Sequence, residues 1–520
     1  MGTKNFSNAN DLITFSRSSA GTALRKIAYG PELVTNGTFD TDTDWTYGVS
    51  SGWSVGSGVA TFSGGTGDIG LYQSVNPVAG RVYAVSVSQS GRTAGSVVLR
   101  LGGTTNLATV GTADSEYSFF IVAEGANSNF AVIPTGAYRG SVDNISVKEV
   151  LFDDASGDLT LFNHPADIPR IEYDADGNVL GLLVEESRTN LSPNSNFNAG
   201  WSPSNSSLET DAAVSPDGAV NAVKLKVTTS STHHSVYESV AGGTYAVSVF
   251  AKAGEYDGIQ LTGVQTTDDH ACFNLIDGTA YHTGTNASNA TIEDFGNGWY
   301  RCSAVIPVTN GNLYIAVTDG ASTAWLPSFA GANTTDGIYI YGAQIEAGDF
   351  PTSYIPTDGA TATRSADVAS IPVADFGYNQ SGGSVLLEFS LPDSWVGSGF
   401  PSVIMLYEDG LNRFGLTTAS NSDDFRFNGL DANVSQFDLA KTTNSTGESQ
   451  KHIFAFESNS FVYVADSDTP SVDSSGTFPS ISEIVIGGSG PTSGFINGHI
   501  KSIRYYPRRL TDAQLQELTT

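Results

Sequence analysis

The strongest constraint on this fold is a sequence pattern that occurs twice. Tyr-Ala-Val-Ser-Val stands at residues 83–87 and again at residues 245–249. A Tyr-x-Ser-Val element begins eleven positions before the first copy and eight positions before the second. Apolar and small polar residues that alternate at a period of two are typical of a half-buried strand. A repeated all-β unit predicts a tandem of compact modules rather than one large enzyme core, and such tandems commonly bind other molecules.

Further matching elements frame each copy. An Asn-x-x-Phe element with a nearby tryptophan lies upstream, at residues 36–39 with Trp45 and at residues 194–197 with Trp201. Predicted closing strands lie downstream, at residues 143–149 and 336–346. The repeat places Trp45, Trp53 and Trp201 in cores. The second copy has extra residues in the region 268–299. We expect them to form longer loops, where binding specificity commonly resides.

Length and composition predict an all-β protein of several domains with almost no helix. A chain of 520 residues exceeds one hydrophobic core, and its 57 glycines favour many tight turns. The expected order is an N-terminal segment (1–30), a β module (31–150), a connector (151–190), a second β module (191–355), a second connector (356–378) and a different β module (379–520). Residues 174–177 (Asp-Ala-Asp-Gly) predict a turn between two strands. Residues 511–514 form a capping box that predicts one helix, followed by Leu515 and Leu518 on one face.

The charge balance argues against nucleic acid and anionic membrane surfaces as ligands. The chain has 24 basic and 54 acidic residues, a formal net charge of -30. Bare nucleic acid and anionic membrane surfaces are therefore not expected as ligands, because both attract cationic faces. We expect no membrane insertion, since no run of about 18 apolar residues occurs, and we see no signal-peptide pattern at the N-terminus. Cys272 and Cys302 lie in the same predicted module, either as a disulfide or as two buried thiols.

Three segments resemble motifs of structural proteins from tailed bacteriophages. They are residues 15–20 (Phe-Ser-Arg-Ser-Ser-Ala), residues 170–174 (Arg-Ile-Glu-Tyr-Asp) and residues 181–191 (Gly-Leu-Leu-Val-Glu-Glu-Ser-Arg-Thr-Asn-Leu). The first repeated module stands between the first two segments, as if it were inserted there. We therefore expect residues 11–29 and 151–190 to associate in space. The resemblance implies a virion protein made in the host cytoplasm, with capsid, portal or tail proteins as partners.

The modules themselves add a second resemblance. Both repeated modules resemble phage-borne carbohydrate-binding jelly-rolls, and residues 495–511 resemble the closing strand and helix of concanavalin A-like or laminin G-like domains. Together these resemblances imply a tail fibre, tail spike or head fibre that attaches to host cell-surface polysaccharide through weak, multivalent sites. Residues 1–30 are then the expected docking element. Fibre proteins are commonly homotrimers, although the chain shows no coiled-coil heptads.

Aromatic residues are the first candidates for sugar contact, because sugars stack their C–H faces on exposed rings. Trp325 lies in a loop-like stretch with no counterpart in the first repeat. Tyr256 follows a predicted strand, and Trp395 precedes a Gly-Ser-Gly run in the last module. These three residues are the predicted carbohydrate contacts.

Acidic residues raise the question of calcium. Asp40, Asp42 and Asp44 alternate as oxygen ligands do in a calcium loop. Trp45 and Ser51 occupy the sixth and twelfth positions, where an EF-hand needs glycine and glutamate, so only a simpler structural calcium site remains. The adjacent His233 and His234 would point to opposite faces of a strand, so we expect surface positions rather than a metal pair.

Nothing in the sequence points to catalysis. It lacks a His-Glu-x-x-His pair and a phosphate loop. Glu185 and Glu186 would point apart on a strand, so they are not placed for joint acid and base work. We expect no enzyme. A polysaccharide depolymerase, whose carboxylates could come from distant segments, and a non-binding decoration protein of capsid or tail stay open as alternatives.

Overall fold

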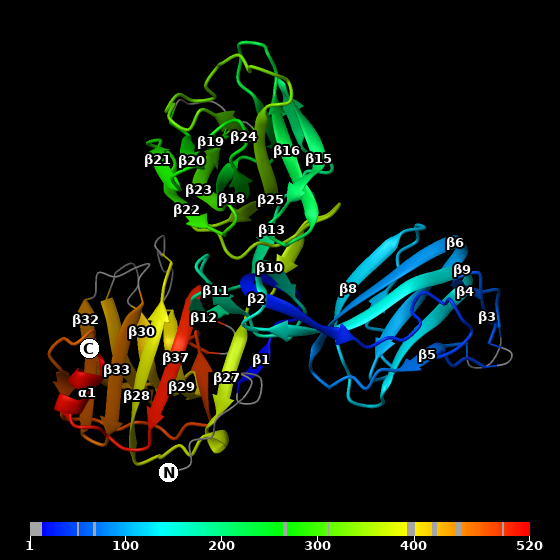
Figure 1. The fold of residues 1–520 in the computed structure, drawn as a ribbon. Coiled ribbons are helices and arrows are strands. Elements are labelled where there is room, and N and C mark those ends of the chain that lie inside the picture. The colour runs from blue at the N-terminus through cyan, green and yellow to red at the C-terminus, as the bar shows by residue number, and fades with distance from the viewer. Residues whose placement is uncertain are drawn as a thin grey trace. The chain divides into compact units, whose positions relative to one another are not determined.

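The computed structural model describes residues 13–48, 51–65, 69–263, 268–309, 311–392, 401–418, 424–442, 449–490 and 493–520. They form a nearly all-β protein (Figure 1). Residues 26–158 make one compact unit, here the inserted unit, and the remainder on both sides of it makes a second. The first repeated module, expected at residues 31–150, lies within the inserted unit. No helix in the described part of the chain has the length and apolar character needed to cross a membrane.

The inserted unit is organised by two long strands that run through both of its layers. Its strands are β3 (Trp53–Gly56), β4 (Val59–Phe62), β5 (Leu71–Ser74), β6 (Val82–Leu101), β7 (Ala108–Thr109), β8 (Glu116–Val122) and β9 (Asn129–Phe152), joined by the end of β2 (Gly21–Glu32). Strand β6 pairs with β9 along both halves, with register shifts near Gly91 and Gly95. Both glycines have positive φ, so β6 bends there.

The repeated Asn-x-x-Phe…Trp pattern is one structural corner used twice. In the inserted unit, Trp45 Nε1 donates to the Asn36 carbonyl at 3.0 Å, and its ring lies 5.2 Å from that of Phe39. In the second copy the same hydrogen bond measures 3.0 Å and the same ring distance 4.9 Å, through Trp201, Asn194 and Phe197. All these rings are buried, as the repeat predicts.

The second repeat, here the middle module, is a sandwich of two six-stranded sheets. One sheet contains β14 (Ser202–Ser204), β17 (Ser235–Ser239), β24 (Asn312–Thr318), β19 (Gly258–Gly263), β20 (His270–Asn274) and β21 (Thr279–Thr283). The other contains β15 (Ser206–Val214), β16 (Val220–Val227), β25 (Gly337–Ala347), β18 (Gly243–Lys252), β23 (Trp299–Val308) and β22 (Ser288–Asp294). The expectation of longer loops in the region 268–299 is wrong, because those residues form β20, β21 and β22. Their pairing satisfies backbone groups that loops would leave to water.

The two cysteines of the middle module are buried free thiols rather than a disulfide. Cys272 lies on β20 and Cys302 on β23, in different sheets of the sandwich. Burial raises the pKa of both thiols.

The C-terminal sandwich is completed by strands from far earlier in the chain. Its first sheet runs β1 (Thr14–Ser16), β27 (Val368–Pro372), β36 (Glu483–Ile486), β29 (Ser402–Asp409), β30 (Asn412–Thr418), β31 (Asp424–Asp431) and β32 (Val434–Thr442). Its second runs β11 (Ile171–Tyr173), β12 (Val179–Val184), β37 (Gly498–Tyr506), β28 (Gly382–Ser390), β33 (Gln450–Glu457), β34 (Ser460–Ala465) and β35 (Ser471–Asp473). Helix α1 (Asp512–Leu518) follows, with the predicted capping box of Thr511 and Gln514. Segments expected as docking element and connector thus supply β1, β11 and β12.

The phage-like motifs meet in a buried cluster of charges, here the ion hub. Its members are Arg17, Arg170, Glu185, Arg364 and Asp367, whose side chains are at most 6% exposed. Asp367 accepts from Arg17 at 3.0 Å and from Arg170, and Glu185 accepts from Arg170 at 2.8 Å. Arg17 also donates to three carbonyls of residues 164–168. These contacts confirm the expected association of the segment around Arg17 with residues 151–190.

The hub keeps its charges because each carboxylate faces more than one cation. Burial by itself would raise the pKa of Glu185, but Arg364, Arg170 and hydrogen bonds from Ser353 outweigh it and hold that pKa well below its usual range. Burial and the neighbouring Arg170 lower the pKa of Arg17 to about 10, so its guanidinium stays protonated at neutral pH. Glu185 is therefore a structural anion, and it does not act as the partner of Glu186 in catalysis.

Candidate functional site

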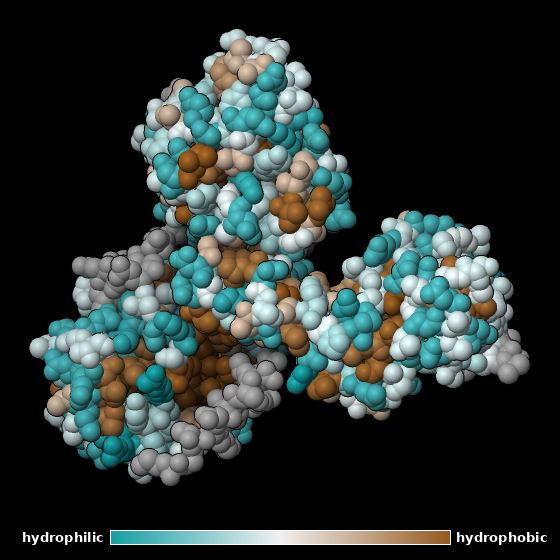
Figure 2. Space-filling model, viewed as in Figure 1, coloured by the Kyte–Doolittle hydropathy of each residue, from teal (hydrophilic) through white to brown (hydrophobic). Residues whose placement is uncertain are grey.

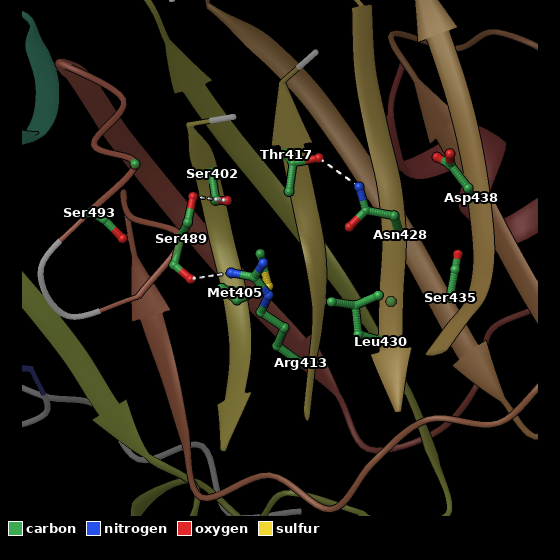
Figure 3. A pocket seen from close by; sticks show the side chains of 12 residues that line it. Ser402, Met405, Arg413, Thr417, Asn428, Leu430, Ser435, Asp438, Ser489 and Ser493 are labelled. Carbon is green, nitrogen blue, oxygen red and sulfur yellow. Dashed lines mark hydrogen bonds between the residues drawn. The ribbon is translucent and has the colours of Figure 1, made fainter. Parts of the chain in front are cut away.

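One hollow of the C-terminal sandwich lies on the outer face of its first sheet (Figure 3). This hollow, here the sandwich groove, encloses about 550 Å³. It is lined by Ser402, Met405, Arg413, Thr417, Asn428, Gly429, Leu430, Ser435, Asp438, Ser489, Ser493 and Gly494. Most of these residues lie on β29, β30, β31 and β32. The groove is therefore formed chiefly by strand side chains rather than by loops.

Strand register explains why the face is hollow. Met405, Gly415, Asn428 and Asp438 stand opposite one another on four successive strands. Gly415 has no side chain, so nothing fills the row between Met405 and Asn428. A Cβ at Gly415 would lie 2.2 Å from the Ile404 carbonyl oxygen, so the backbone admits only glycine there without a shift.

Hydroxyl and amide groups line one side of the groove. Asn428 Nδ2 donates to Thr417 Oγ1 at 2.9 Å, and in Figure 3 the Asn428 oxygen points between the strands. The hydroxyls of Ser402 and Ser489 lie 2.9 Å apart. Asp438 is held by an ion pair with Arg426. Such groups can both donate to and accept from sugar hydroxyls.

The groove also contains a cation and an apolar floor. Arg413 Nη1 donates to the Ser489 carbonyl at 3.2 Å and lies beside Met405 (Figure 3). Met405 and Leu430 contribute apolar surface, and Leu411 and Val434 are exposed at neighbouring turns of β30 and β32. A concave site with apolar surface and a few directional polar groups is the usual form of a small-molecule site.

A second polar groove lies on the middle module and encloses about 490 Å³. Its lining includes Asn196, Asn198, Asn221 and Tyr341. Tyr341 donates to the Asp217 carboxylate at 2.8 Å. The Asn221 side-chain oxygen is buried and has no hydrogen-bond partner among the described residues. This module therefore also presents amide groups in a hollow.

Two of the predicted aromatic contacts, Trp325 and Tyr256, lie outside both grooves. Trp325 is partly buried, and its Nε1 donates to Thr262 Oγ1 at 3.0 Å. Tyr256 packs against Phe329, with ring centroids 5.1 Å apart. Trp395 lies outside the described residues. Figure 2 shows mostly hydrophilic and neutral residues on the visible face of the middle module, with separate hydrophobic spots.

The predicted calcium residues are exposed and satisfied locally. Asp40 accepts from Thr38 at 2.8 Å, Asp42 from Tyr47 at 2.7 Å, and Asp44 from its neighbour Thr43. Within the described ranges, no three side chains of His, Cys, Asp or Glu come together in a group that could hold a metal ion.

The expectation of surface histidines is wrong for His234. Its side chain is fully buried, and its ring nitrogens lie 2.6 Å and 2.9 Å from the carbonyls of Asn205 and Phe329. These carbonyls compensate the imidazole for lost water, so it serves as a structural tie within the middle module.

Sequence reasoning missed the groove residues. Their only signal was the run of polar residues at alternate positions of β30 and β31, here Arg413, Thr417, Arg426 and Asn428. Such alternation identifies a solvent-facing surface, but the hollow depends on which strands are neighbours, and that comes from the fold.

Neither a family model nor a curated protein matches this chain. Similar solved structures include the receptor-binding domain of botulinum neurotoxin C/D mosaic serotype, at 9% identity over 30% of this chain and 40% of that one, with a TM-score of 0.25. Domains LG4-5 of the mouse laminin α1 chain match at 13% identity over 56% of this chain and 92% of that one, with a TM-score of 0.21. A Trypanosoma rangeli sialidase matches at 9% identity over 89% and 81%, with a TM-score of 0.23. Likenesses at these scores carry no information on ligand or activity.

Proposed function

We propose that this chain is a structural protein of a tailed-bacteriophage virion, a fibre or spike that binds host cell-surface polysaccharide. The sandwich groove is the observation that carries the binding role, because hydroxyl, amide and guanidinium groups there surround an apolar floor. The virion role is supported by the phage-like motifs, which contribute Arg17, Arg170 and Glu185 to the ion hub.

Binding on a particle would be multivalent. The sandwich groove and the middle-module groove are both open hollows, which suits weak individual sites. Many copies on one virion raise avidity without any tight single site. In this proposal the chain is made in the host cytoplasm, contacts capsid, portal or tail proteins, and is a homotrimer. A mass of about three times 54.4 kDa in light scattering would support that last point.

A polysaccharide array tests the binding role. Purified full-length protein is applied to printed bacterial capsular and O-antigen polysaccharides, with and without a calcium chelator, and reducing-end release is followed in the same samples. We expect saturable binding without release, and weaker binding of an Asn428→Ala variant. Loss of binding in the presence of the chelator would indicate a structural calcium ion. Absence of binding to every polysaccharide would refute the proposal.

The decoration alternative is favoured by the burial of tryptophan. Trp45, Trp53, Trp201 and Trp299 are all at most 9% exposed, and Trp325 is partly buried with its N–H bonded. A spacer needs no exposed ring. Binding of particles that lack this protein to host cells with unchanged affinity would support the spacer role.

The depolymerase alternative has one observation in its favour. A cleft of about 490 Å³ is lined by several carboxylates, among them Glu172, Asp174, Glu293 and Asp294. Glu172 lies 2.7 Å from His499 Nε2. Sugar release that a Glu172→Gln variant abolishes would establish an enzyme, whereas release-free binding would retain the adhesin.

A further inference from the structure

Arg413 differs from Arg426 and from the hub arginines because it has no carboxylate partner among the described residues. It is half-buried on β30 and forms no ion pair in the part of the chain that the structure describes. On the next strand Arg426 pairs with Asp438, and the three hub arginines share two carboxylates. The single hydrogen bond of Arg413 goes to a backbone carbonyl, so most of its donors remain available at the groove.

The chemistry of these donors selects a planar anion. A guanidinium presents its N–H groups as a rigid fork that matches a carboxylate in two parallel hydrogen bonds. The groups around Arg413 match the rest of an acidic sugar. Asn428 and Thr417 offer amide and hydroxyl groups to ring hydroxyls, while Met405 and Leu430 offer apolar surface to the C–H face.

We propose that the sandwich groove binds an acidic polysaccharide, with the carboxylate of a uronic acid or another carboxylated sugar paired with Arg413. This inference rests on the proposed glycan-binding function and names its ligand class. The pairing is local, because the chain as a whole carries a charge of -30 and repels a polyanion at long range. Raising the ionic strength from low values to about 0.15 M should therefore speed association with an acidic polysaccharide, since the Debye length falls to about 8 Å and the repulsion is screened.

The experiment uses the full-length protein on an array in which each polysaccharide is printed in three forms: native, carboxyl-reduced and dephosphorylated. We expect binding to native and dephosphorylated acidic polysaccharides and its loss after carboxyl reduction. An Arg413→Gln variant should bind roughly 10- to 100-fold more weakly, as expected for the loss of hydrogen bonds to a charged group. Arg413→Lys keeps the charge but not the forked N–H donors, so its affinity should lie between those of the native protein and Arg413→Gln. The matched control is Arg504→Gln, an exposed arginine on the opposite sheet of the same sandwich.

The outcomes separate this inference from the function beneath it. Binding that survives both carboxyl reduction and Arg413→Gln would overturn the acidic ligand and leave glycan binding intact. Loss of binding after dephosphorylation alone would overturn the carboxylate assignment in favour of a phosphorylated glycan. No binding to any printed form would overturn the proposed function and this inference together. Unchanged melting of Arg413→Gln shows that a weaker signal is not a folding defect, and if that variant is unstable, Arg413→Lys and the reduced polysaccharides still decide.

Discussion

Replacing Asp367 by asparagine removes the anion that most hub arginines share. The Asp367 carboxylate accepts from Arg17 at 3.0 Å, from Arg170, and from the backbone N–H of Glu185 at 3.0 Å. Arg364 approaches it to 3.7 Å. Asparagine keeps the size but has one acceptor oxygen, and its amide turns N–H donors toward guanidinium donors. The hub would then hold three buried cations and one carboxylate, Glu185, which pairs with Arg170 and Arg364.

The burial of these side chains determines how much stability the substitution removes. Arg17, Arg170 and Asp367 have fully buried side chains, so water cannot replace the missing charge. Removing one partner from a buried ion pair costs about 3–5 kcal/mol. For a cooperative unit of about 150–250 residues this corresponds to a fall of roughly 6–20 °C in melting temperature. An exposed pair costs no more than about 1 kcal/mol.

Calorimetry of the full-length protein measures the effect. The matched control is Glu388→Gln on the C-terminal sandwich, which removes the partner of Lys501, a lysine that is 44% exposed. We expect the transition of the C-terminal sandwich to shift in Asp367→Asn and to move little in Glu388→Gln. The inserted unit, residues 26–158, should keep its own transition in both variants. If the sandwich melts at the same temperature in Asp367→Asn as in Glu388→Gln, the hub is hydrated and the reasoning from buried charge is wrong.

Four further results are expected. The folded-state pKa of Glu185 is depressed, so the hub's stabilisation is fully present above the unfolded pKa of about 4.3 and is lost as pH falls toward the folded value. The melting temperature should therefore be constant near neutral pH and fall below about pH 4. The fall should be less steep in Glu185→Gln, and an equal slope in both proteins would contradict this reasoning. Cys272 and Cys302 should resist a thiol reagent in the native protein and react fully in denaturant, whereas fast native labelling would argue against their burial. Thr511→Ala should destabilise the sandwich by about 1 kcal/mol in urea titration through loss of the helix cap, and no change would assign α1 no part in its stability. A fragment of residues 379–520 lacks β1, β11, β12 and β27, so edges of β36 and β37 are uncovered; we expect it to aggregate in gel filtration, and a folded monomer would contradict the borrowed-strand account.

Local sequence patterns predicted those features of the fold that depend on residues close together in the chain. The Asn-x-x-Phe…Trp element was readable because its hydrogen bond and ring contact join residues fewer than ten positions apart. The capping box at Thr511 was readable for the same reason. The insertion was readable because the phage-like motif is interrupted at a recognisable place, between residues 20 and 170. Features that depend on a few neighbouring residues survive in the linear sequence.

Features that depend on strand neighbours could not be predicted. The region 268–299 has no strong helix or core signal, and its extra strands form only because β19 and β23 offer edges to pair with. Trp325 lies in a loop-like stretch, yet Thr262 on β19 satisfies its indole N–H and holds the ring partly buried. The sandwich groove needs Gly415 between Met405 and Asn428, a relation that exists only after β29, β30 and β31 pair. Each of these outcomes depends on register between distant segments.

Arginine side chains occur both in the ion hub and in the sandwich groove, and they differ in whether a carboxylate pairs with them. Acidic residues outnumber basic residues 54 to 24, so carboxylates are available to pair with an arginine that the fold buries. Arg17 and Arg170 are paired in this way, and their loss should change stability without changing ligand preference. Arg413 is half-buried among polar groups and remains without a carboxylate in the described ranges. Removing it should therefore leave melting unchanged and alter ligand preference, which is the reverse of the result for the hub.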